Sequence, residues 1–213
     1  MDLFQPLDDY ADLQYEQLKK KAEDCMQCLL HKTRTQVVFG QGPVPCDLML
    51  IGEAPGEQED LSGLAFVGKA GQLLTKVLES ADIDREKDIY ITNIIKCRPP
   101  QNRTPQANEV EACHLFLIRQ IQLVNPKIIL LAGAPAVKAV LKVNDSMSNV
   151  RGKWFSLKNT EIKIMPIYHP SFLLRNPARG AGSPKWQTWQ DMQEIKNAVS
   201  FIKKVKELGK NEN

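Results

Sequence analysis

Several features that would assign the sequence to a specialised class are missing. No apolar run among the 213 residues approaches the length of a membrane span. The 28 Lys and Arg nearly balance the 25 Asp and Glu, so the net charge of +3 is compatible with a polyanionic partner without demanding one. The first ten residues, MDLFQPLDDY, lack the basic start and apolar stretch of a secretory signal, so we expect a cytoplasmic protein.

Histidine is also scarce, and cysteine occurs in an odd number, five. An odd count in a reducing compartment argues against a disulfide framework and leaves metal binding or plain burial. Cys25 and Cys28 form a C-x-x-C pair at the end of a predicted helix, whereas Cys97 follows a strand and Cys113 lies inside the next helix. This spacing is too wide for zinc held by two tight pairs. It suits a four-thiolate iron–sulfur cluster at least as well, and ordinary buried cysteines are about equally favoured. Cys46 has no partner in the pattern and is interpreted as structural.

Strands and helices alternate along the chain. The apolar periodicity and the turn residues predict helices at 8–24, 69–83, 104–124 and 185–208, strands within 46–56, 88–100 and 161–167, and a strand, glycine turn and helix across 125–141. This order predicts one domain over 1–213, with a three-layer α/β/α fold around a central, mostly parallel sheet of four strands. Pro105 is expected in the first turn of its helix. The N-terminal helix and the first cysteines occupy about 8–45, and the tail at 209–213 is expected to fray.

Three loops with unusual chemistry follow predicted strands, at 52–68, 93–103 and 168–175. Ligands of open α/β sheets bind beyond the carboxyl ends of the strands, so the three loops should converge on one site. The last of them, YHPSFLLR, places three apolar side chains in a loop that should run over the surface.

The first loop, GEAPGEQED, combines backbone freedom with negative charge. Gly52 and Gly56 let the backbone approach a ligand, but no Gly-Lys-Ser/Thr follows, so the loop is not a P-loop. A solvated acidic loop is the alternative interpretation of its four carboxylates, which are Glu53, Glu57, Glu59 and Asp60. Phe66 lies between glycines, where its ring can serve as a stacking platform or pack in the core.

The other two loops carry an amide, several cations and a histidine. Asn93 ends the second strand, and its side chain has the donor and acceptor needed to read the edge of a pyrimidine. Lys96, Arg98 and Arg103 make KCRPPQNRTP a stiff basic loop suited to phosphate contacts or to solubility alone. His169 can donate a hydrogen bond to a developing anion, whereas the two remaining histidines, His31 and His114, have no such setting and are interpreted as incidental.

Four motifs taken in order, GEAPG, AFVG, NIIKCRPPQNRTP and HPSFLLR, resemble those of the family 4 uracil-DNA glycosylases, the iron–sulfur branch of that superfamily. The resemblance runs from about Cys25 to the final helix. It implies that a structural [4Fe-4S] cluster is bound by four thiolates, those of Cys25, Cys28, Cys97 and Cys113. It also implies an enzyme that flips deoxyuridine out of single- or double-stranded DNA and hydrolyses its N-glycosidic bond, which releases uracil and leaves an abasic site.

The resemblance further implies roles for the pocket residues. Phe66 would stack on uracil and Asn93 would read its edge, with the backbone around Gly52 and Ala54 completing the pocket. His169, neutral, would donate to uracil O2 and stabilise the departing anion.

The water-activating group is less directly implied, because Ala54 stands where the best-known branch of the superfamily has an aspartate. Glu53 is therefore the first candidate to orient the water or stabilise the cationic sugar, with Glu59 and Asp60 behind it. Glu59, or the backbone of its loop, is also expected to block the methyl group of thymine. A related branch of the superfamily traps DNA covalently and has a basic, histidine-containing insertion at this place. NIIKCRPPQNRTP contains no histidine, so we expect turnover instead of a covalent trap.

The remaining expectations concern DNA. Lys69, Arg98, Ser171 and Arg175 are the expected phosphate contacts. Leu173 is the expected wedge that fills the space left by the flipped base, with Leu174 packing inward and Phe172 doing either. A monomer associated with the nucleoid is expected, and the sequence does not decide whether it contacts a replication clamp or a polymerase. The alternatives are an iron–sulfur electron carrier and a non-catalytic DNA-binding module.

Overall fold

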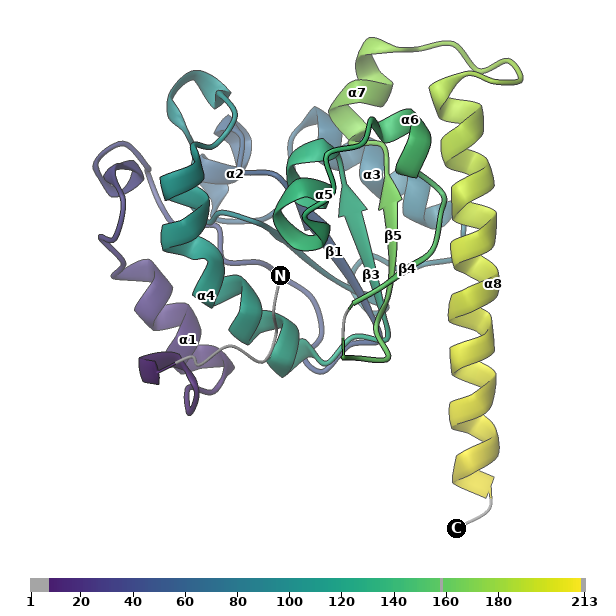
Figure 1. Ribbon diagram of the computed structural model, residues 1–213, viewed down its shortest axis with the longest axis horizontal. Coiled ribbons are helices and arrows are strands. Elements are labelled where there is room, and N and C mark those ends of the chain that lie inside the picture. The colour runs from purple at the N-terminus through teal and green to yellow at the C-terminus, as the bar shows by residue number, and fades with distance from the viewer. Residues whose placement is uncertain (1–7, 158, 212–213) are drawn as a thin grey trace.

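A twisted sheet of five strands forms the centre of the computed structural model, which describes residues 8–157 and 159–211 (Figure 1). The order across the sheet is β2-β1-β3-β5-β4. Four parallel strands make up most of it, namely β1 (Leu48–Gly52), β2 (Ile89–Asn93), β3 (Ile128–Ala132) and β5 (Lys163–Ile167). These are the four predicted strands. The fifth, β4 (Phe155–Ser156), pairs antiparallel with β5 at the edge. The predicted count of four strands was therefore one short, because two residues are too few to show a period.

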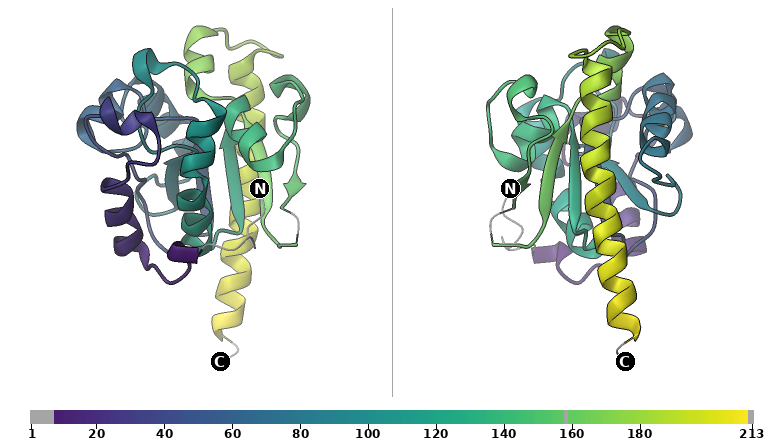
Figure 2. Two further views of the ribbon diagram at one scale, coloured as in Figure 1. Left: turned by 60° about the vertical axis from the view of Figure 1, so that its left-hand side comes forward. Right: turned by 90° about the vertical axis from the view of Figure 1, so that its right-hand side faces the viewer.

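Helices cover both faces of the sheet, which confirms the three-layer α/β/α prediction (Figures 1 and 2). One face packs against α1 (Tyr15–Glu23), α4 (Ala107–Val124) and α5 (Ala134–Leu141). The other packs against α3 (Lys69–Glu79) and α8 (Pro184–Asn211). Every residue of β1, β2 and β3 is buried, as expected for parallel strands with both faces covered.

Shorter helical segments lie before or between these elements. They are α2 (Glu57–Ser62), α6 (Met147–Val150), α7 (Pro170–Arg175) and the 3-10 turns Asp8–Tyr10, Leu29–Lys32 and Pro100–Asn102. None of the helices in the described part of the chain combines the length and the apolar character needed to cross a bilayer.

Several predicted boundaries differ from the structure. The N-terminal helix begins at Tyr15 instead of residue 8. Pro105 lies two residues before α4, which starts at Ala107 with Gln106 as its N-cap, so the proline is outside the first turn. The predicted frayed tail is helical at 209–211, and residues 212–213 lie outside the described residues.

The stretch YHPSFLLR is also not a loop. Its last six residues form α7, with His169 as the N-cap and the backbone N–H of Ser171 donating to the imidazole. Proline in the first turn and a side-chain cap favour a helix start, and these signals outweigh the expectation from a strand end. The apolar side chains of this stretch therefore divide between the two faces of a helix.

Candidate active site and cysteine cavity

The three predicted loops meet at the carboxyl ends of the parallel strands and enclose a cavity of about 400 Å³. The first loop and the start of α3 contribute Glu53, Ala54, Pro55, Gly56, Glu59, Phe66 and Ala70; the loop after β2 contributes Asn93, Pro99, Asn102 and Arg103; and the last contributes His169, Ser171 and Arg175. Parallel strands end at a common edge, which is why segments more than a hundred residues apart in sequence face one space.

Asn93 forms the deep end of this cavity. It is the last residue of β2 and only 1% exposed, and its side-chain oxygen accepts no hydrogen bond from the described part of the chain. A buried polar atom without a partner is costly, so this oxygen is suited to a ligand that donates to it. Gly52 lies opposite in β1, and a Cβ there would overlap both Asn93 Oδ1 and the ring of Phe66. Glycine at 52 therefore allows the amide and the ring to share one pocket.

Phe66 and His169 form the two ring surfaces of the cavity. Their centroids are 5.7 Å apart with planes inclined by 38°. Phe66 is 5% exposed and has a φ of 53°, which is uncommon for a residue other than glycine. The ring is thus buried in the core on the side of α3 and α8, as one interpretation from the sequence expected, and it also lines the cavity.

The histidine has a defined protonation state. Ser171 N–H donates to His169 Nδ1 at 3.2 Å, and Ser171 Oγ lies 2.8 Å from the same atom. Because Nδ1 accepts, the proton of the neutral ring is on Nε2. Burial, helped by the charge of Arg175 and opposed by Glu59, lowers the pKa of His169 to about 4. The imidazole is therefore a neutral Nε2–H donor at physiological pH.

The four carboxylates of the first loop have separate tasks. Glu59 Oε1 accepts from the backbone N–H groups of Val67 and Gly68, both at 2.8 Å, and Oε2 accepts from Gly56 N at 3.1 Å. Asp60 is buried, lies outside the cavity lining and binds Thr35 N, so the suggestion that it activates water was wrong.

Glu53 is the carboxylate best placed for chemistry. It is half-buried and lines the cavity, and its pKa is raised by burial and partly lowered again by a hydrogen bond from the Thr104 side chain. Glu57 is 62% exposed and lies 3.8 Å from Arg98, so it belongs to the rim.

Two cations of the second loop are held by oxygen atoms of the protein itself. Lys96 is buried, and its ammonium donates to Thr92 Oγ1 at 2.7 Å and to the backbone oxygen of Asn93 at 2.6 Å. Arg103 forms a two-pronged ion pair with Glu109, with N–O distances of 2.8 and 2.6 Å. Both stabilise the segment that carries Asn93 and Thr104, and the suggested phosphate role was wrong for Lys96 because its side chain does not reach solvent.

The leucines of the last stretch are placed opposite to the prediction. Leu173 is 2% exposed and packs inward, whereas Leu174 is 43% exposed. Successive residues of a helix point about 100° apart, so only one of the two can face the core here. The prediction that Leu173 is the wedge was therefore wrong. The predicted phosphate contacts remain accessible, since Lys69 and Arg175 are exposed, Ser171 is partly exposed, and 24% of the Arg98 side chain is exposed.

A second, smaller cavity is lined by cysteine side chains. All four cysteines singled out in the sequence, Cys25, Cys28, Cys97 and Cys113, line it. The fifth cysteine, Cys46, lies elsewhere and donates to Asp88 O at 3.4 Å. Arg34 Nη1 lies 3.3 Å from Cys97 Sγ and also donates to Cys25 O at 2.8 Å, so it joins the two cysteine segments.

The described residues contain no group of three Cys, His, Asp or Glu side chains arranged to hold a single metal ion. In a four-iron cluster each thiolate binds a different iron atom, so its ligands surround a cavity without meeting at one point. The four cysteines line one cavity, and thiolates are the usual ligands of iron–sulfur clusters, so the residues present fit such a group.

Comparison of the sequence with known proteins identifies the family of this chain. The family model of the uracil DNA glycosylase superfamily matches residues 39–193. A type-4 uracil-DNA glycosylase of Thermotoga maritima is 41% identical over 193 residues, which cover 89% of this chain and 95% of that protein. The type-4 uracil-DNA glycosylase of Saccharolobus solfataricus is 41% identical over 199 residues (90% and 88%), and that of Archaeoglobus fulgidus 40% over 168 residues (76% and 84%). The chain belongs to the type-4 uracil-DNA glycosylases.

Sequence reasoning missed some residues of this type-4 uracil-DNA glycosylase. Thr104 contacts Glu53, and Asn102 and Pro99 line the cavity, although all three lie inside the motif NIIKCRPPQNRTP. Arg85 was missed as well. It contacts the loop that carries Phe66, and as a single arginine outside every motif it gave no signal.

Proposed function

We propose that this protein hydrolyses the N-glycosidic bond of deoxyuridine in DNA, releasing free uracil and leaving an abasic site. The observation that carries the proposal is the side-chain oxygen of Asn93, buried and unpaired in a cavity that also holds Phe66 and a neutral His169. An electron carrier or a non-catalytic DNA-binding module needs none of these three residues in one cavity.

Base selection would rest on Asn93 and its surroundings. Asn93 Oδ1 accepts from N3–H of uracil and its Nδ2 donates to O4, whereas cytosine presents the opposite pattern and leaves the amide mismatched. The base stacks on Phe66. Glu59, held by three backbone N–H groups, makes a rigid wall that excludes the methyl group of thymine.

Bond cleavage would rest on His169 and Glu53. The base leaves as an anion, and the Nε2–H of His169 donates to O2; one such oriented donor typically contributes about 3 kcal/mol. Because the neutral imidazole of His169 donates a hydrogen bond and keeps its proton, it does not have to be reprotonated between turnovers. Glu53 orients the attacking water or stabilises the positively charged sugar, and Thr104 holds its carboxylate.

The nucleotide reaches this cavity only after it leaves the base stack. We propose Leu174, in place of Leu173, as the side chain that fills the vacated space, because it is the exposed leucine of α7. Ser171, Arg175, Arg98 and Lys69 would contact the phosphates on either side. Lys69 is exposed at the first residue of α3 and stands outside the cavity lining.

The cofactor proposed for this chain is a [4Fe-4S] cluster held by Cys25, Cys28, Cys97 and Cys113. When bound, the cluster would supply a rigid cross-link between the N-terminal segment and the loop after β2, without redox chemistry. Arg34 already connects these two segments through Cys25 O and Cys97 Sγ, and it stabilises the charge of that thiolate.

The testing experiment is the release of free uracil from oligonucleotides that contain one deoxyuridine, single- and double-stranded, with matched thymidine and deoxycytidine strands as controls. Wild-type protein should release uracil and leave an alkali-labile site, and Asn93→Ala should lose most of this activity while still binding DNA. A purified, cluster-loaded protein that binds these strands without releasing uracil would overturn the proposal. We further propose a monomer in the cytoplasm, beside the nucleoid, which size-exclusion chromatography and fluorescent tagging would test.

A further inference from the structure

Phe66 owes its position to an unfavourable backbone. Its φ of 53° lies in the left-handed region, which bulky side chains rarely adopt. Such a conformation persists only where the surrounding structure determines it. The two peptide groups that flank Phe66 set its φ and ψ, so their hydrogen-bond partners decide where the ring points.

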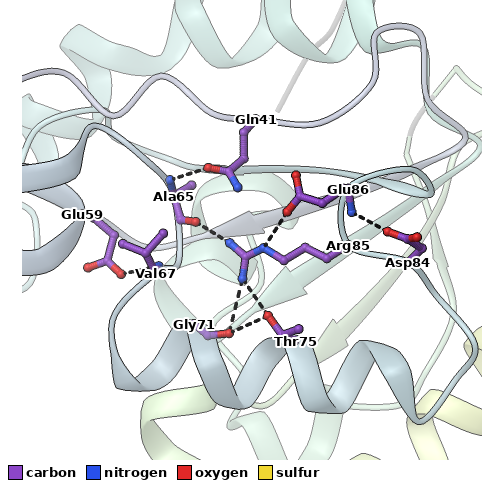
Figure 3. A network of polar contacts seen from close by, with 9 residues as sticks. All are labelled: Gln41, Glu59, Ala65, Val67, Gly71, Thr75, Asp84, Arg85 and Glu86. Atoms are coloured by element: carbon purple, nitrogen blue, oxygen red, sulfur yellow. Dashed lines mark hydrogen bonds and ion pairs between the residues drawn. The ribbon is translucent and has the colours of Figure 1, made fainter.

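Arg85 and Gln41 both bind Ala65, the residue before Phe66, and Figure 3 shows their side chains at its backbone. Arg85 Nη2 donates to the carbonyl oxygen of Ala65 at 2.6 Å. The Ala65 N–H in turn donates to Gln41 Oε1 at 3.1 Å. Since the Ala65 carbonyl belongs to the peptide plane that defines φ of Phe66, a guanidinium fixed at this oxygen fixes that dihedral angle.

The peptide group after Phe66 is held from the opposite side. Val67 N and Gly68 N both donate to Glu59 Oε1 at 2.8 Å. The Val67 N–H belongs to the plane that defines ψ of Phe66. One positive and one negative side chain therefore determine the two dihedral angles of the residue between them.

Arg85 is itself fixed. Only 11% of its side chain is exposed, and its Nη1 donates to Thr75 Oγ1 at 3.0 Å and to Gly71 O at 3.3 Å, both on α3. Thr75 Oγ1 also donates to Gly71 O at 3.2 Å. Gly71 lies directly against Phe66, because a Cβ there would overlap the carbonyl group of Phe66. Helix α3, Arg85 and the Phe66 loop thus form one interlocked unit behind the pocket.

We propose that Arg85 is a positioning residue for uracil recognition: by holding the Ala65 carbonyl against α3, it fixes the ring of Phe66 at the face of the uracil pocket. It touches neither the base nor the reacting bond. The inference rests on the proposed role of Phe66 as the stacking platform, and it assigns to this enzyme a specificity residue that lies behind the pocket wall.

A double-mutant cycle on uracil release from single-stranded DNA tests this, with Arg85→Met, Phe66→Ala and the double variant. Single strands are chosen because base extrusion does not then limit the rate. Phe66→Ala should lower kcat/KM by about 10- to 100-fold, as expected for loss of one base-stacking ring. Arg85→Met should lower it by about 10-fold or more through a displaced ring. In the Phe66→Ala background, Arg85→Met should cost less than about 2-fold, because no ring is left to position.

A second readout is inhibition by free uracil, which should weaken in parallel with kcat/KM in Arg85→Met. Arg85→Lys, which keeps the charge and one donor toward Ala65 O, should recover part of both. Arg119→Met is the matched control, since Arg119 likewise holds a backbone carbonyl oxygen, in its case Leu13 O, to which it donates twice, at 3.0 and 2.9 Å. It should lower the melting temperature without changing inhibition by uracil.

The outcomes separate the two proposals. Equal losses from Arg85→Met with and without Phe66, or unchanged inhibition by uracil, would show that Arg85 only stabilises the fold and would overturn the inference. Wild-type activity in Phe66→Ala would instead overturn the platform role itself. If Arg85→Met does not fold, Arg85→Lys and Thr75→Val take its place in the same cycle.

Discussion

Gly52 and Asn93 lie directly opposite each other in neighbouring parallel strands, and the missing side chain of one makes room for the amide of the other. The ring of Phe66 occupies the same space. The amide of Asn93 and the ring of Phe66 are therefore packed into the space that a Cβ at residue 52 would take.

Gly52→Ala should consequently damage the pocket more than the fold. The new methyl group must displace Asn93 Oδ1 and Phe66, which we expect to lower kcat/KM by about 100-fold. The accompanying loss of stability should be about 1–3 kcal/mol, the usual cost of overpacking. Steady-state kinetics and chemical denaturation measure the two effects. Gly180→Ala is the control, because a Cβ there meets no atom within 4 Å. Activity within twofold of wild type in Gly52→Ala would contradict the pocket geometry.

The partly buried imidazole of His169 should make stability depend on pH. The pKa of His169 falls from 6.5 to about 4 on folding, so between these values the unfolded chain binds a proton that the folded chain does not. Stability from this group is complete above pH 6.5 and is lost as the pH falls toward 4, by roughly 3 kcal/mol in total. Urea unfolding at pH 7.0 and 4.5 should show a smaller drop in His169→Asn than in wild type. Equal drops would mean that the imidazole is exposed to protonation in the folded state.

His169→Asn should also separate chemistry from binding. Without the Nε2–H donor, single-turnover cleavage should slow by about 100-fold or more, since one oriented donor of this kind is worth 10²–10³ in rate. The dissociation constant for DNA carrying an uncleavable deoxyuridine analogue should change less than threefold, because the proposed phosphate contacts and the Asn93 amide are untouched. A parallel loss of binding and cleavage would assign His169 a structural role.

The two leucines of α7 should respond differently to truncation. Leu174→Ala removes an exposed side chain, so stability should change by less than about 0.5 kcal/mol. Uracil release by the Leu174→Ala variant should fall on duplex DNA but stay near the wild-type rate on single strands, which need no wedge. Leu173→Ala should cost about 2–5 kcal/mol of stability and affect both substrates alike. Equal effects of Leu174→Ala on both substrates would remove the wedge assignment.

Replacement of four of the cysteines should remove bound iron, and replacement of the fifth should not. Serine at Cys25, Cys28, Cys97 or Cys113 should each lower the iron content and the visible absorbance of the purified protein, and each should reduce its melting temperature. Cys46→Ser should leave iron and absorbance unchanged, because this thiol lies at another place in the fold and contacts Asp88 O. Iron content measured against protein concentration checks the division. Full iron in any of the first four variants would exclude that cysteine as a ligand.

Much of the site could be predicted from the sequence because parallel strands end at a common edge of the sheet. The strands ending at Gly52 and Asn93, and the loop that starts at His169, had to meet at one edge of the sheet, and they do. The grouping of Cys97 and Cys113 with Cys25 and Cys28 came instead from the family resemblance, because their spacing alone left ordinary buried cysteines about equally favoured.

The sequence could not predict the features that depend on where an individual side chain points. A one-residue step on the short helix α7 decides between Leu173 and Leu174, and six residues are too few to show a periodicity. Lys96 is buried because its ammonium finds two oxygen acceptors, which no motif announces. The carboxylates of GEAPGEQED look alike in sequence, and only their backbone partners distinguish Glu53 from Glu59 and Asp60.

The position of His169 at the start of α7 has an evolutionary consequence. The imidazole that lines the cavity also caps the helix that carries Leu174, so the spacing between the two side chains is fixed by the start of this helix. Insertions or deletions within 169–174 would separate the two and should be selected against. The exposed residues 177–182 that lead to α8 have no such constraint, and natural variation in the length of this part of the chain should accumulate there.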